Sequence, residues 1–191
     1  MKDAEYQVIA FASPSEWEEW LRSENGKTPG IWMKYAKKGS GITTLNHQEA
    51  IEVALCYGWI DGQGKKLDDN YWLVKFTPRG AKSIWSKRNV EIVDRLISEK
   101  RMQAAGLIQI EAAKKDGRWD LAYDSPKNMV VPADFLKMLA KDKKAESFFQ
   151  TLNKTNTYAI VWRLQTAKKP ETRVRRMTAI LEMLSKEEKF H

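Results

Sequence analysis

The sequence predicts an α+β protein with a small mixed or antiparallel sheet and packed helices in its N-terminal half, followed by a C-terminal bundle of short helices. All segments with strand-like alternation or β-branched and aromatic residues lie before residue 80. Beyond that residue, apolar positions recur at helical spacing. An irregular stretch at 120–131 separates two parts, so we expect an α/β core over 1–120 and a helical region over 121–191, packed on that core.

Strands mixed with two helices are expected in the first half. The expected strands cover 6–11, 31–36, 59–67 and 71–77, and the expected helices begin at Ser13 and Asn46. Ser13 is an N-cap residue followed by Pro14, and Asn46 has Glu49 three residues later, and both patterns are typical of helix starts. The helix after Asn46 has little polar surface, which indicates that it is mostly buried.

The second half reads as a series of helices. They are expected after Ser86, over about 103–115, after Pro132, around Phe148 and Phe149, over 157–167, and from Pro170. Each has an apolar stripe, and the segment 157–167 is apolar on several sides. These helices are short enough to form a compact bundle.

The composition is that of a globular protein. The chain has 191 residues, of which 42% are hydrophobic and 30% are charged. No apolar run approaches the roughly 18 residues of a membrane span, and the N-terminus carries Asp3 and Glu5 without the apolar segment of a signal peptide. A single cysteine, Cys56, excludes an intrachain disulfide, so we expect a cytoplasmic protein.

The positive charge is concentrated in the second half. Residues 1–80 hold 10 Lys/Arg and 11 Asp/Glu, a net charge of −1, whereas 81–191 hold 23 and 14, a net charge of +9. Such a half attracts nucleic acid, anionic lipid or acidic protein, or it is simply a solvated surface. Its predicted basic surface comprises Arg173, Arg175 and Arg176; Tyr158 and Trp162 nearby are expected to dock the last helix.

The segment 56–89 is the strongest candidate for a site, because it places large aromatics beside acids, amides and bases. Apolar walls with a few polar groups are what a ligand site requires. The residues predicted to bind a ligand or partner are Trp32, Lys34, Trp59, Asp61, Gln63, Asp68, Arg79, Ser83, Trp85 and Asn89. The alternative is that Asp61 and Asp68 are turn residues and that Arg79 pairs with one of them.

Classical nucleophilic or metal catalysis is not indicated. The chain has only two histidines, His47 and His191, and Cys56 lies on the buried helical segment. These are too few ligands for a zinc site, so we predict no metal and no cofactor. An enzyme acting on a small anionic substrate would use Asp61 or Asp68 as general base and Lys or Arg as the anion clamp.

Several strings along nearly the whole chain resemble the YdeI/OmpD-associated family of bacterial proteins, also labelled bacteriocin-protection proteins. They include GWIDGQ, FTPR, SIWS and AKKPETR, in the family's order. The segment 101–105 departs from the family, because it lacks the Thr-Pro helix start expected there. The AKKPETR string is also similar to the tail of small frataxin-like proteins proposed to handle iron, for which Asp61, Asp68 and Asp69 would be the candidates.

The resemblance implies a small cytoplasmic protein linked to tolerance of cationic antimicrobial peptides and bacteriocins, with no established reaction or cofactor. We therefore expect a non-catalytic protein that binds a protein partner or a small polar or anionic ligand. Nucleic-acid binding through the basic half and an enzyme acting on a small anionic substrate are the alternatives.

Overall fold

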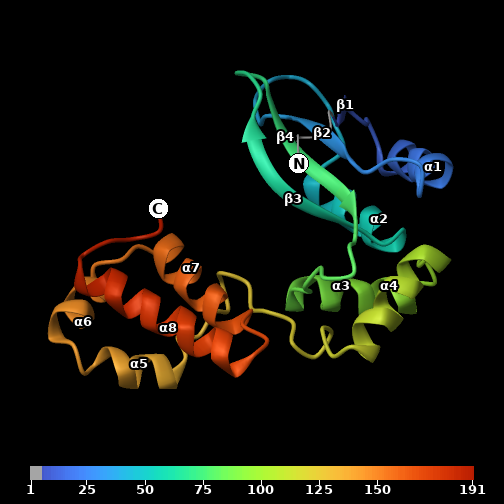
Figure 1. Ribbon diagram of the computed structural model, residues 1–191. Coiled ribbons are helices and arrows are strands. Elements are labelled where there is room, and N and C mark those ends of the chain that lie inside the picture. Colours follow the sequence, from blue (N-terminus) through green and yellow to red (C-terminus); the bar gives the residue numbers. More distant parts are fainter. Residues whose placement is uncertain (1–5) are drawn as a thin grey trace. The chain divides into compact units, whose positions relative to one another are not determined.

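The computed structural model describes residues 6–191, which form two compact units (Figure 1). The N-terminal unit contains the chain up to Ser83 together with Asn89–Asp120, and the C-terminal unit contains Ile84–Arg88 and Leu121–His191. Asp3 and Glu5, which entered the expectation about the N-terminus, lie outside the described residues.

The N-terminal unit is a four-stranded mixed sheet with helices. Its elements are β1 (Gln7–Ile9), α1 (Pro14–Glu24), β2 (Ile31–Ala36), α2 (His47–Cys56), β3 (Trp59–Lys66), β4 (Tyr71–Pro78), α3 (Lys87–Ser98, which begins in the C-terminal unit) and α4 (Ala104–Lys115). The strand order is β1-β2-β4-β3, with β1 parallel to β2 and the other neighbours antiparallel. The α+β prediction is confirmed.

Helices α1 and α2 cover one face of this sheet. Ile31, Met33 and Tyr35 alternate with half-buried residues along β2 and point into the core. On this inner face the Trp17 ring of α1 meets Phe76 of β4 edge-on, at 5.8 Å between ring centroids. The opposite, outer face carries Trp32, Lys34 and Lys75, which are half-buried.

The caps that the sequence predicts begin α1 and α2. The Ser13 hydroxyl accepts from the Glu16 backbone N–H at 3.3 Å, and the Asn46 side chain accepts from Glu49 at 3.0 Å. The start of α1 differs slightly from an ideal capping box. The Glu16 carboxylate accepts from the Ala12 N–H and not from the Ser13 N–H.

An ion-pair network ties α2 to α3. The Glu52 carboxylate of α2 lies 2.6 Å from the Arg95 guanidinium of α3 and 3.5 Å from that of Arg101. Both arginines also reach Glu99, and these contacts hold the pKa of Glu99 below its ordinary value. A network of this kind orients the two helices more firmly than a single exposed pair would.

The C-terminal unit is a bundle of four short helices. They are α5 (Ala133–Leu139), α6 (Lys143–Gln150), α7 (Lys154–Gln165) and α8 (Pro170–Ser185). Their shared core consists of Phe135, Leu139, Ala145, Ile160, Leu164, Ile180 and Leu184. All four correspond to helices expected from their apolar stripes, although α7 begins at Lys154, after its N-cap Asn153, and not at the expected residue 157.

Three carboxyl groups of the C-terminal unit have depressed pKa values. A hydrogen bond from Lys87 lowers the pKa of Asp124, one from Arg173 lowers that of Asp134, and one from Ser185 lowers that of Asp142. A carboxyl whose pKa is lower in the folded than in the unfolded chain stabilises the fold above its unfolded pKa. That contribution is lost as pH falls through the folded pKa.

We therefore expect the C-terminal unit to lose stability as pH falls below about 4, the ordinary range of Asp. The methyl NMR signals of Ile160 and Ile180 in the whole protein report the unfolding of this unit. We expect the urea concentration at the midpoint of their transition to be lower at pH 3 than at pH 6. The Asp134→Asn variant should show a smaller difference between the two pH values. An unchanged midpoint in the parent protein would contradict the assignment.

Candidate functional site

The outer face of the sheet places three lysines on three aromatic rings. The Lys34 ammonium lies 4.4 Å from the Tyr71 ring centroid, that of Lys65 lies 4.1 Å from Trp32, and that of Lys75 lies 3.9 Å from Tyr6. These are cation–π distances. We call the surface formed by Tyr6, Trp32, Lys34, Lys65, Tyr71 and Lys75 the aromatic–lysine face.

Strand register creates this arrangement. Trp32 of β2 lies opposite Lys75 of β4, and Leu73 lies between Lys34 on one side and Lys65 on the other. Side chains on neighbouring strands at the same level share a face. The register shift between Asp61 and Gly64 in β3 is what brings Lys65 to this face while Asp61 points to the other.

No acidic side chain belongs to this face within residues 6–78. Alternation and register assign to it Tyr6, Val8, Trp32, Lys34, Ala36, Ile60, Lys65, Tyr71, Leu73, Lys75 and Thr77. Of these, only Leu73 is fully buried. Three positive charges without a negative one give the face a positive potential that favours an anionic ligand.

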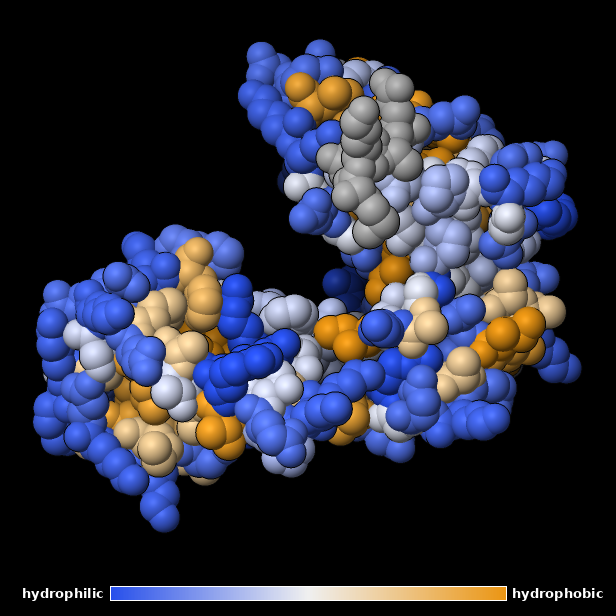
Figure 2. All heavy atoms as spheres, viewed as in Figure 1, coloured by the Kyte–Doolittle hydropathy of each residue, from blue (hydrophilic) through white to orange (hydrophobic). Residues whose placement is uncertain are grey.

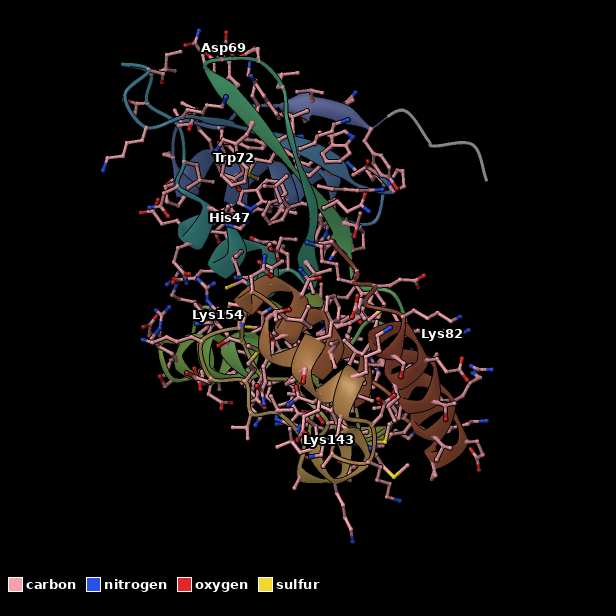
Figure 3. All side chains as sticks on the ribbon, turned by 90° about the vertical axis from the view of Figure 1, so that its left-hand side faces the viewer. His47, Asp69, Trp72, Lys82, Lys143 and Lys154 are labelled. Atoms are coloured by element: carbon pink, nitrogen blue, oxygen red, sulfur yellow. The ribbon has the colours of Figure 1, made fainter. Side chains whose placement is uncertain are left out.

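A second polar cluster lies on the inner side of the sheet, where α2 begins. The His47 Nε2 atom lies 3.6 Å from the Asp61 Oδ2 atom, slightly beyond hydrogen-bond distance. The rings of Tyr35 and Trp72 stack at 4.9 Å, and His47 stands edge-on to both. Figure 3 shows His47 and Trp72 close together, with Asp69 apart from them at the tip of the β3–β4 hairpin.

The Tyr35 hydroxyl belongs to this cluster and has no hydrogen-bond partner among the described residues, although Tyr35 is only 2% exposed. Burial, and then the nearby Asp61 carboxylate, raise the pKa of Tyr35 well above its ordinary value. It is therefore a neutral donor. A hydroxyl, an imidazole and a carboxylate have the elements of general acid–base chemistry.

The ten residues predicted to bind a ligand do not lie on one surface. Trp32 and Lys34 are on the aromatic–lysine face, Asp61 is on the inner side, and Trp59 is 0% exposed. Gln63 is exposed at the irregular part of β3.

Asp68 is a turn residue, the alternative that the sequence left open. Its carboxylate accepts from the backbone N–H groups of Asn70 and Tyr71 at 2.8 Å. Its neighbour Asp69 pairs with Lys66 at 2.9 Å. Asp61 lies elsewhere on β3, so the three aspartates considered for iron do not form one cluster.

The remaining predicted residues follow β4. Arg79 and Asn89 are buried, and Ser83 bonds locally, since its hydroxyl accepts from the Gly80 N–H at 3.0 Å. The Ser83 carbonyl accepts from the buried Arg118 guanidinium at 2.8 Å. Trp85 is buried and belongs to the C-terminal unit, where its carbonyl accepts from the Tyr123 N–H at 3.0 Å.

Two of the three arginines in the predicted basic surface bond within the C-terminal unit. Arg173 donates to the Leu164 carbonyl at 2.7 Å and to both oxygens of Asp134, and Arg176 donates to the Arg163 carbonyl at 2.7 Å. Cations at the end of α7 satisfy its last carbonyls. Arg175 is exposed.

The C-terminal unit also has a groove of about 330 Å³, lined by Trp162, Arg163, Arg176, Ala179, Ile180, Met183 and Phe190. Figure 2 shows apolar side chains at the surface of this unit, among the helices α5–α8. The Arg163 guanidinium lies 3.7 Å from the Phe190 ring centroid. Phe190, near the C-terminus of the chain, therefore already contacts the Arg163 guanidinium of this groove.

Cys56 is unsuited to nucleophilic chemistry. It is buried, and burial raises the pKa of its thiol to about 11. A thiol with such a pKa is protonated at neutral pH, and the thiolate is the reactive form.

The residues predicted to bind a ligand do not include Tyr6, Lys65, Tyr71 and Lys75 of the aromatic–lysine face, or His47, which lies beside Asp61. Period-two alternation in the string YWLVKF, which separates Tyr71 and Lys75 from Trp72 and Phe76, is the signal that could have found the face. The pairing of His47 with Asp61 has no local signal, because α2 and β3 bring them together.

Within residues 6–191, no helix is long and apolar enough to cross a membrane. The same residues contain no group of three or more His, Cys, Asp or Glu side chains placed to hold a metal ion.

Comparison with known proteins gives two family matches. Residues 9–109 match the model of a family described as a domain of unknown function (DUF8412). Residues 128–187 match the model of the family described as bacteriocin-protection, YdeI or OmpD-associated, which confirms the resemblance for that part of the chain. The searches of curated proteins and of solved structures found no match.

Proposed function

Since this chain belongs to the DUF8412 family, whose description names no activity, we propose a function on the basis of its surface. We propose that it is a cytoplasmic, non-catalytic protein that binds an anionic partner on the aromatic–lysine face. The observation that carries this proposal is the set of three lysines on three aromatic rings, on a sheet face to which residues 6–78 contribute no acid. Trp32 and Lys34, which the sequence already pointed to, belong to it.

The match to the bacteriocin-protection family supports a role in tolerance of cationic antimicrobial peptides or bacteriocins. The protein itself has a formal net charge of +8. Like charges repel, so simple sequestration of a cationic peptide is disfavoured. Binding of an anionic cellular component on the aromatic–lysine face fits the charge better.

The test compares two triple variants with the same loss of charge. Lys34, Lys65 and Lys75 are changed to Gln in one, and the exposed Lys137, Lys141 and Lys154 of the C-terminal unit are changed to Gln in the other. We expect the first variant to lose binding of inorganic polyphosphate, measured by calorimetry, and to lose the tolerance that the parent protein gives bacteria grown with a cationic peptide. The second should behave like the parent; equal losses in both would sink the proposal.

An acid–base enzyme is the second candidate, and the His47–Asp61 pair beside the Tyr35 hydroxyl favours it. The His47→Gln variant decides between the two in the same tolerance assay. Loss of tolerance in His47→Gln, with full tolerance in the sheet-lysine variant, would replace the binding proposal with acid–base chemistry at that cluster.

A further inference from the structure

We propose that the anionic partner of the aromatic–lysine face is a single-stranded nucleic acid. This inference rests on the proposed function and adds the chemistry of the ligand. Three lysines could bind any polyanion, but Trp32, Tyr71 and Tyr6 on the same face provide flat rings beside the charges. Proteins that bind single strands without sequence preference combine a positive surface with aromatic rings on which bases stack.

The lysines that cover the rings in the free protein do not prevent stacking. A cation–π contact at an exposed site changes an equilibrium about 2- to 5-fold, whereas stacking of one base on an aromatic side chain contributes about 5- to 150-fold. Lys65 is exposed, so its flexible side chain can swing from the Trp32 ring to a phosphate. Binding therefore replaces one contact, Lys65 on Trp32, by two: a base on Trp32 and Lys65 on a phosphate. This exchange favours the bound state.

The position of the rings distinguishes this ligand from a membrane surface. Trp32, Tyr71 and Tyr6 are half-buried, and each presents a ring face to the ammonium above it. Anchoring in a bilayer requires apolar side chains that reach into the headgroup region. A ring that offers its face from the floor of a sheet suits a planar base better.

The location of this face differs from the expectation based on charge. The sequence pointed to the basic second half for nucleic-acid binding, and there Arg173 and Arg176 bond to helix-end carbonyls. The aromatic–lysine face lies in the half whose net charge is close to zero. Local alternation along strands, and not the total charge, concentrates the cations.

The experiment measures binding of fluorescent oligothymidine and oligouridine of about ten nucleotides to the whole protein at about 50–200 mM salt. We expect a slope of log affinity against log salt of about −2, since each of three phosphate contacts contributes about 0.7 on a single strand. The Lys34, Lys65 and Lys75 to Gln variant should bring the slope close to zero, and the Lys137, Lys141 and Lys154 to Gln control should keep it.

The stacking step has its own variant. Trp32→Ala should weaken oligonucleotide binding about 5- to 150-fold while leaving the salt slope unchanged, and Trp32→Phe should restore most of it. Circular dichroism confirms that each variant is folded.

Two competitors separate failure of this inference from failure of the proposed function. If inorganic polyphosphate binds as tightly as the oligonucleotides and Trp32→Ala has no effect, the nucleic-acid inference is overturned while the anionic-partner proposal stands. The same holds if vesicles of phosphatidylglycerol bind and oligonucleotides do not. If no polyanion binds in a lysine-dependent way, both fall.

Discussion

Replacing Trp59 with alanine is expected to lower the free energy of unfolding of the N-terminal unit by about 3–5 kcal/mol, the range for a large aromatic side chain removed from a core. Trp59 is 0% exposed and meets Trp17 and Trp20 edge-on at 5.9 and 5.8 Å between ring centroids. Its indole N–H donates to the Asn25 side-chain oxygen at 2.9 Å. The substitution therefore creates a cavity and leaves the half-buried Asn25 acceptor without this donor.

Urea unfolding followed by tryptophan fluorescence measures this effect, with Trp32→Ala as the matched control. Trp32 lies on the aromatic–lysine face and is only half-buried, so its loss should cost about 1 kcal/mol or less, as expected away from a core. Equal losses at both positions would show that Trp59 is not the core residue that its contacts indicate. The comparison also separates a tryptophan that holds the fold from one that is proposed to bind a ligand.

The sequence predicts the elements of this fold well, because local signals determine them. Ser13 and Asn46 cap α1 and α2 as expected, and prolines begin α1 and α8. Alternation along Ile31–Ala36 separates the buried from the half-buried positions of β2. Each of these signals operates within a few residues, where the sequence pattern and the structure coincide.

The candidate site depends on tertiary structure and is harder to predict. Trp59 and Asp61 are two residues apart and do share a face of β3, but α1 and α2 cover that face, so the tryptophan is core and not the wall of a site. The register shift before Gly64 then turns Lys65 to the other face. Neither the covering helices nor the shift is visible in the local pattern of 56–89.

The strings that carry the family resemblance have structural explanations in two places. In AKKPETR, Pro170 begins α8 and Arg173 ties the end of α7 to Asp134. In AGL (residues 105–107), which also belongs to the resemblance, Gly106 lies in the first turn of α4, where that helix meets the C-terminal end of α2. Pro170, Arg173 and Gly106 therefore have structural roles in this fold.

The second large effect is expected at Gly106. Helix propensity predicts that alanine there stabilises the protein, whereas the close packing of α2 and α4 predicts that it destabilises it. Alanine in place of glycine within a helix normally stabilises by about 1 kcal/mol. A Cβ atom at Gly106 would lie 2.3 Å from the Cys56 carbonyl oxygen and 2.8 Å from that of Leu55. Both are backbone atoms of the last turn of α2, and they cannot rotate away as a side chain could.

We therefore expect Gly106→Ala to lower the free energy of unfolding of the N-terminal unit by about 2–3 kcal/mol, the cost of overpacking a close contact. Urea unfolding by tryptophan fluorescence again provides the measurement, and Gly80→Ala is the control. A Cβ atom at Gly80 would meet only the Ser83 hydroxyl, at 3.9 Å, so that variant should stay within about 0.5 kcal/mol of the parent. A gain in stability at Gly106 would mean that α2 and α4 do not approach each other as closely as these distances require.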